Sequence, residues 1–129
     1  MMRFLMGATA LAGGFAFTAD ARAAAADYRF ELVGKPQLLA GKDIVQVQLV
    51  RIADGKSVPN VLIFESTADM GPAGMAAMTA PVTALPMKGG IASFEISPGM
   101  AGTWALHLAA KVQGEAETVR GTVNADLVK

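Results

Sequence analysis

The sequence has 129 residues, which leaves room for one domain of ordinary size. It contains no cysteine, and its 11 basic side chains balance its 11 acidic ones. These totals exclude thiolate nucleophiles, Cys-x-x-Cys redox motifs and cysteine-based zinc sites, and they give no electrostatic basis for binding nucleic acid or an anionic membrane, because both partners need clustered Lys and Arg.

Residues 1–23 have the layout of a cleavable secretory signal peptide. Arg3 provides a short positive region, an apolar run covers residues 4–17, and the Ala-Arg-Ala segment at the end fits a cleavage site. The apolar run is too short to anchor the chain, because spanning a bilayer takes roughly 20 apolar residues and Asp20 interrupts this one. We therefore expect an exported protein whose mature domain, residues 24–129, has no membrane span.

From residue 28 onward, short runs with a hydrophobic period near two alternate with Gly, Pro and Asp signals, which is typical of β-strands and turns. The run at 28–32 alternates Tyr, Phe and Leu with Arg and Glu. The run at 43–53 places Val and Leu side chains on one face and ends at the turn signal Asp54-Gly55. The run at 61–64 lacks this alternation, so we expect a strand that is buried on both faces.

The rest of the chain continues this pattern. Further runs lie at 81–87, 91–96, 103–108 and 119–127. Pro86 interrupts the first of them, which predicts a short strand at the edge of a sheet. The last two alternate most clearly, and Gln113-Gly114 joins them as a hairpin. About seven strands at this spacing predict an all-β fold, an immunoglobulin-like β-sandwich with Trp104 buried between the sheets. A small barrel is the alternative fold.

One segment differs from the others in composition. Residues 66–81, STADMGPAGMAAMTAP, contain Met70, Met75 and Met78 but no branched aliphatic or aromatic residue. A segment that covers the core would be expected to mix its methionines with such residues. We therefore expect a long loop whose thioethers stand among small residues.

A fourth methionine is predicted to lie near this loop. Met100 belongs to the connection 97–102, and connections in an immunoglobulin-like topology lie at alternating ends of the sandwich. The connections 66–81 and 97–102 should therefore share one end. Met87 falls in a connection at the opposite end and is a weaker candidate for the same site.

Clustered thioethers favour a monovalent copper ion, because soft sulfur ligands bind Cu(I) in preference to Mg²⁺, Ca²⁺ or Zn²⁺. Thioether sulfur has no proton to lose, so such a site should withstand mild acidification. Gly71, Pro72 and Gly74 allow a tight turn, and Met75 and Met78 would lie on one side of a single helical turn. The alternative is that flexible methionines pack against the core or a partner protein without metal.

A resemblance strengthens the copper interpretation. The segment Met70-Gly71-Pro72-Ala73-Gly74-Met75-Ala76-Ala77-Met78 is followed later by Met100-Ala101-Gly102-Thr103-Trp104. With these motifs, the stretch 65–128 resembles the YtkA-like/FixH-like group of periplasmic domains, which pair a Met- or His-bearing loop with a Met-x-Gly-x-Trp segment. The resemblance implies an immunoglobulin-like fold, a periplasmic location and a link with copper handling, since such domains occur alone or attached to heavy-metal efflux adaptor subunits. The missing His in the first loop disfavours Cu(II) more than Cu(I).

Two polar residues near these segments have simpler interpretations. His107, the one histidine, falls within a predicted strand on the face opposite Trp104, so we expect an ordinary sheet-surface residue. Asp69 precedes Met70 and is expected to form an Asx-type turn. The other acidic residues form no pair suited to acid/base catalysis, and the chain has no GxSxG, GxxxxGK[ST] or HExxH motif, so we expect no enzyme.

The sequence thus predicts a periplasmic Cu(I)-binding carrier, buffer or copper-resistance accessory protein. Its expected ligands are Met70, Met75, Met78 and Met100, and the copper ion is its cargo. The rival hypothesis is an interaction module that docks through the same loop on an efflux adaptor or a copper-enzyme assembly partner and binds no metal. Docking would tolerate Leu or Ile in place of methionine, whereas a sulfur-only site would not.

Overall fold

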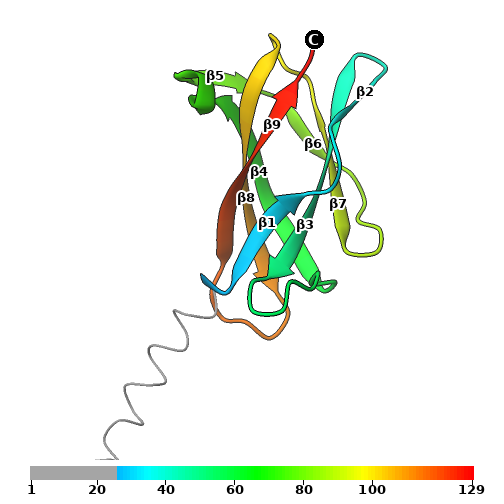
Figure 1. Ribbon diagram of the computed structural model, residues 1–129, viewed down its shortest axis with the longest axis vertical. Helices are drawn as coiled ribbons and strands as arrows, with labels where there is room; N and C mark the ends of the chain where they lie inside the picture. Colours follow the sequence, from blue (N-terminus) through cyan, green and yellow to red (C-terminus); the bar gives the residue numbers. More distant parts are fainter. Residues whose placement is uncertain (1–25) are drawn as a thin grey trace, which may run out of the picture.

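The computed structural model describes residues 26–129 as two antiparallel β-sheets packed face to face (Figure 1). The first sheet contains β1 (Tyr28–Leu32), β2 (Gln37–Leu39), β3 (Lys42–Arg51), β6 (Val82–Ala84) and β7 (Ile91–Ile96). The second contains β4 (Val61–Met70), β5 (Met75–Ala80), β8 (Gly102–Val112) and β9 (Val119–Leu127). The predicted signal peptide, residues 1–23, lies outside the described residues, so its cleavage stays a prediction.

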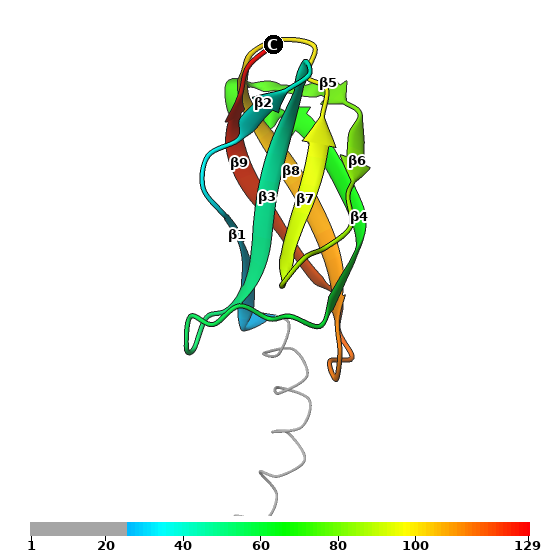
Figure 2. The ribbon, with the colours of Figure 1, turned by 90° about the vertical axis from the view of Figure 1, so that its right-hand side faces the viewer.

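The order of the strands is that of an immunoglobulin-like sandwich. The first sheet has the order β1-β3-β7-β6, with β2 pairing only with β3, and the second has the order β5-β4-β8-β9. These orders correspond to the immunoglobulin strands A-B-E-D and C′-C-F-G. Figure 2 shows the first sheet in front of the second. The predicted all-β, immunoglobulin-like fold is confirmed, including the edge position of the short strand that precedes Pro86.

The core lies between the sheets and is built from the inward half of each alternating strand. Its largest fully buried side chains are Trp104, Phe94, Met70, Ile96, Leu106 and Leu127. Trp104 occupies the predicted place, because β8 is the central strand that pairs with both β4 and β9. In the part of the chain that the structure describes, no helix has the length and apolarity needed to cross a membrane.

The predicted long loop at 66–81 is wrong. β4 does not end at Phe64 but continues to Met70, a short 3₁₀ turn η2 (Gly71–Ala73) follows, and β5 returns antiparallel to β4. The strand continues because its backbone keeps pairing with β8 as far as Asp69, so ladder hydrogen bonds form even though the residues are small. Gly74 ends the turn in the left-handed conformation that glycine adopts most easily.

A second unpredicted strand lies near the N-terminus. β2 pairs with the start of β3 through a tight turn at Ala40 and Gly41, which both have positive φ angles. A two-residue hairpin turn of this kind normally carries Asn-Gly or Asp-Gly. Because Ala40 takes the first position here, the sequence gives no signal for the turn. All three β2 residues are exposed, so hydrophobic alternation gives no signal for this strand either.

Close packing of β1 against β9 leaves little room for a side chain at Gly121. An ideal Cβ at Gly121 would lie 2.7 Å from Cδ2 of Phe30. We expect Gly121→Ala to lower the free energy of unfolding by about 1–3 kcal/mol, measured by urea denaturation, because the buried ring must shift. Gly99→Ala is the matched control, since open space surrounds that position, and its effect should stay within about 0.5 kcal/mol. Equal effects of the two substitutions would contradict this account.

Candidate functional site

The methionine-bearing segments meet at one end of the sandwich. Figures 1 and 2 show β5, the connection between β7 and β8, and the C-terminus together at the upper end. The turn η2 lies against β8, whose first residue follows the connection that carries Met100. The prediction that the connection at 97–102 shares an end with the methionines of the first segment is therefore confirmed.

Met70 occupies a different place from the other three candidate ligands. Its side chain is 1% exposed and belongs to the core cluster, whereas an exposed loop position was expected. An ideal Cβ at Gly102 would lie 2.6 Å from Cε of Met70, so the methyl group packs directly under that glycine. The reason is the continuation of β4: Met70 follows buried Ala68 at the two-residue period of a strand and so points inward.

The other three methionines present their side chains to solvent. Met75, Met78 and Met100 are 38%, 40% and 39% exposed. Met75 stands opposite Met70 in the ladder between β4 and β5. Met78 is one of three extra residues that β5 inserts before Thr79 pairs with Asp69, so the expected helical turn that would carry Met75 and Met78 is replaced by an irregular strand.

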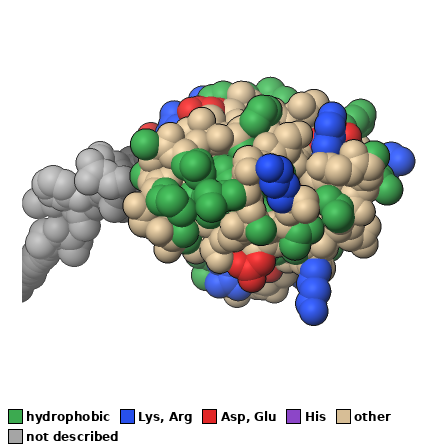
Figure 3. All heavy atoms as spheres, turned by 90° about the horizontal axis from the view of Figure 1, so that it is seen from above, with side chains coloured by type: hydrophobic (Ala, Val, Ile, Leu, Met, Phe, Trp, Pro, Cys, Tyr) green, Lys and Arg blue, Asp and Glu red, His purple; other side chains and the backbone are tan. Residues whose placement is uncertain are grey.

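The segments that carry these methionines contain no charged side chain, and Asp69 borders the first of them at the turn η2. Residues 70–87 and 96–110 contain no Lys, Arg, Asp or Glu. Figure 3 looks down on this end and shows apolar side chains gathered on the side where β5 lies in Figure 1. Within residues 26–129, no group of three or more His, Cys, Asp and Glu side chains could hold a metal ion. Soft thioethers suit a soft monovalent ion better than a hard divalent one.

The core fixes the connection that carries Met100. The Nε1–H group of Trp104 donates a hydrogen bond of 3.1 Å to the backbone carbonyl oxygen of Met100. A buried indole normally satisfies its N–H group in this way. The backbone of Met100 is therefore attached to the centre of the sandwich, while its side chain remains exposed.

The polar residues beside the turn are connected to one another. The Oδ1 atom of Asp69 accepts a hydrogen bond of 2.8 Å from the backbone N–H of Gly71, which confirms the predicted Asx-type turn. The Oδ2 atom lies 2.8 Å from Nε2 of His107. His107 is a partly exposed residue on the outer face of its sheet, as predicted, but sequence reasoning missed its contact with Asp69 because the register between β4 and β8 creates it.

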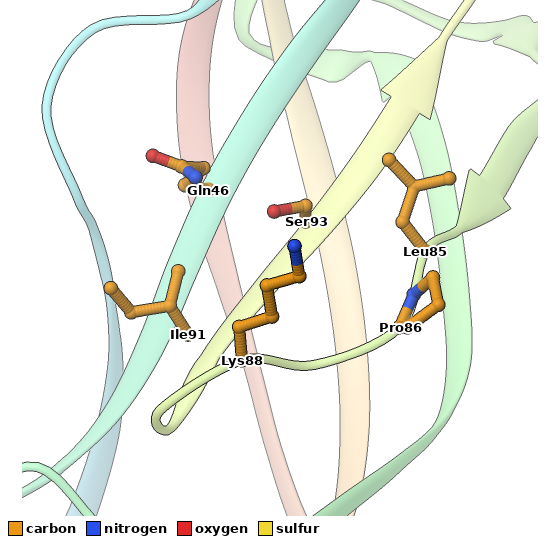
Figure 4. A pocket seen from close by; sticks show the side chains of 6 residues that line it. All are labelled: Gln46, Leu85, Pro86, Lys88, Ile91 and Ser93. Carbon is orange, nitrogen blue, oxygen red and sulfur yellow. The ribbon is translucent and has the colours of Figure 1, made fainter.

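A hollow elsewhere on the surface is a weaker candidate site. It has a volume of about 460 Å³ and is lined by Gln46, Leu85, Pro86, Lys88, Ile91 and Ser93. Figure 4 shows the Lys88 side chain lying across β7 toward Ser93, with Leu85 and Pro86 on one side. The hollow lies on the first sheet, contains none of the predicted ligands and is lined by no sulfur atom. We therefore place the candidate site at the end of the sandwich that carries Met75, Met78 and Met100, called the methionine end below.

Comparisons with known proteins give a family and one structural likeness. A family model described as YtkA-like matches residues 22–109, which is more than half of the chain. The crystal structure of the Lin-41 filamin domain is 18% identical in sequence, the alignment covers 71% of this chain and 90% of that chain, and the TM-score is 0.39. No curated protein matches the chain.

The contrast between Met70 and its neighbours predicts different costs of truncation. We expect Met70→Ala to lower the free energy of unfolding by about 2–5 kcal/mol, because it leaves a cavity in the core. Met75→Ala removes an exposed side chain and should change the free energy by no more than about 0.5 kcal/mol. Denaturation in urea measures both. A large loss from Met75→Ala, or none from Met70→Ala, would show that the burial has been assigned wrongly.

Asp69 predicts a pH dependence of stability. The hydrogen bond from the Gly71 N–H and the contact with His107 hold the pKa of Asp69 below its ordinary value. The contribution of ionised Asp69 to the free energy of unfolding is therefore complete above the ordinary pKa of about 3.9. It is lost as pH falls from there through the lower pKa of the folded state. We expect Asp69→Asn to flatten the acid limb of a stability–pH profile measured by urea denaturation. An unchanged acid limb would refute the prediction.

Proposed function

Because the chain belongs to the YtkA-like family, we propose that it is an exported, periplasmic Cu(I)-binding carrier or buffer, an accessory protein of copper handling and not an enzyme. The observation that carries the proposal is the set of three thioethers, each about two fifths exposed, on charge-free segments that meet at one end of the sandwich. Copper is the cargo of this protein, and the proposal involves no change to the ion or to another substrate.

The proposed ligands are Met75, Met78 and Met100. Their sulfur atoms are neutral and soft, which matches the ligand preference of Cu(I). Two of them come from the hairpin of β4 and β5, and the third comes from the connection that Trp104 attaches to the core. We assign Met70 to support rather than to binding, because its buried side chain packs under Gly102 and fixes the backbone opposite Met75.

Partial exposure of the ligands suits transfer of the ion. A partner can approach from the solvent side and replace the thioethers one at a time by its own ligands. Neutral thioethers do not cancel the positive charge of Cu(I), so an acceptor with anionic thiolates would hold the ion more tightly. The proposed carrier would therefore deliver copper readily to such an acceptor.

A second candidate function is docking without metal. It is favoured by the uncharged surface of residues 71–80, on which Pro72, Ala73, Ala76 and Ala77 are exposed beside Met75 and Met78. An exposed apolar surface of this kind marks protein contact sites as well as ligand sites. The partner would be an efflux adaptor or a copper-enzyme assembly protein.

Substitution by leucine separates the two functions, because leucine keeps size and apolarity but removes sulfur. We expect Met75→Leu, Met78→Leu and Met100→Leu each to weaken Cu(I) binding by about tenfold or more, which corresponds to about 1.4 kcal/mol. The measurement is titration of the mature protein with Cu(I) against a chromophoric chelator. Docking on a partner should survive the same substitutions.

Two control variants complete the experiment. Met70→Leu keeps the buried apolar packing and removes only a sulfur atom that does not bind the ion, so copper affinity should stay unchanged. Met87→Leu should also leave it unchanged, because Met87 packs against the core outside the two segments. Unchanged copper uptake in all three ligand variants would remove the Cu(I) hypothesis and leave docking. A loss of copper binding in Met70→Leu would overturn the division between ligands and support.

A further inference from the structure

A chain of hydrogen bonds crosses the outer face of the second sheet. It ends in the methionine hairpin, which is formed by the end of β4, the turn η2 and β5 (residues 69–80). The Oγ1 atom of Thr122 on β9 lies 2.9 Å from Nδ1 of His107 on β8. On the other side of the ring, Nε2 lies 2.8 Å from Oδ2 of Asp69 on β4. The other carboxylate oxygen of Asp69 accepts the N–H of Gly71, the first residue of η2. Three strands and the turn are thereby connected.

The register of the sheet places these groups in line. His107 is paired with Thr67 on one side and with Thr122 on the other, so the three side chains share one face. Asp69 lies two residues beyond Thr67 on β4 and therefore points to the same face, diagonal to the imidazole. This face is opposite to the one that carries Trp104.

The connection persists in either charge state of the imidazole. With Asp69 ionised, Nε2–H must donate to the carboxylate, since a carboxylate only accepts. In the neutral ring, Nδ1 accepts from the Thr122 hydroxyl group, and in the charged ring it donates to the same oxygen. A ring held on both sides in this way orients the carboxylate of Asp69.

The hairpin needs support of this kind, because its own ladder is short. β5 pairs with β4 at only three positions, and the register shifts between the last two of them. The Asp69 side chain also packs closely against the turn, since an ideal Cβ at Gly71 would lie 2.9 Å from Oδ1 of Asp69. The contact between Asp69 and His107 therefore adds a side-chain link to β8 where the backbone pairing of β4 with that strand ends.

We infer that Asp69 and His107 are positioning residues of the methionine hairpin, which hold the turn before Met75 against β8 and so set the distance between the hairpin thioethers and Met100. This inference rests on the proposed Cu(I) function and adds to it residues that do not touch the ion. In other metal sites, loss of a residue that orients a ligand lowers affinity by about tenfold to a hundredfold.

The test compares four variants of the mature protein by Cu(I) titration against a chromophoric chelator. His107→Leu and Asp69→Leu remove the connection, and we expect each to lower affinity about tenfold. Asp69→Asn should keep about wild-type Cu(I) affinity, because the amide oxygen can accept from the Gly71 N–H and the amide NH₂ can donate to neutral His107. Thr122→Val is the matched control: it removes one contact of the ring but leaves the connection between His107 and Asp69, so affinity should stay within about threefold of wild type.

Amide hydrogen exchange of the same variants separates positioning from general destabilisation. In His107→Leu, exchange should accelerate at residues 71–78 while the amides of β8 and β9 remain as protected as in the wild type. Wild-type affinity in both leucine variants would overturn the inference and leave the Cu(I) proposal intact. If Met75→Leu, Met78→Leu and Met100→Leu all bind copper normally, the Cu(I) proposal fails, and hydrogen exchange alone then tests the positioning role. Acceleration confined to residues 71–78 supports that role, and unchanged exchange overturns it.

Discussion

Burial of Trp104 between the two sheets is the interaction on which the rest of the structure depends. The chain has no cysteine, so the domain is held together by its core rather than by disulfide bonds. Trp104 is the bulkiest fully buried side chain, and its N–H group binds the carbonyl oxygen of Met100. One residue thus stabilises the packing of both sheets and fixes a connection at the methionine end. Stability and the geometry of the candidate site are therefore coupled.

Much of the fold could be predicted because alternation of apolar residues reflects burial of one face. The run at 91–96 coincides with β7, and its Phe94 and Ile96 are buried as expected. Alternation fails where backbone pairing alone makes the strand. β2 is fully exposed, and β5 consists of Met, Ala and Thr with almost no buried side chain, so neither has a hydrophobic signal.

The candidate site was predicted in its location but not in its detail. Alternating connections were enough to bring Met100 to the end that carries the first methionine segment. The burial of Met70 depends on how far β4 stays paired with β8, which composition does not reveal. The contact between Asp69 and His107 is still harder to foresee, because a bulge between Ile63 and Glu65 shifts the register by one residue before the two strands reach it.

The three extra residues of β5 separate the hairpin from the sandwich. β4 is held by β8 along its length, whereas β5 meets it only at Ala68, Asp69 and Met70. Residues added or deleted between Met75 and Thr79 would alter the reach of the hairpin without shifting any core side chain. The scaffold therefore offers a grafting position, where foreign loops of varied length and donor chemistry can be displayed on an unchanged, cysteine-free frame.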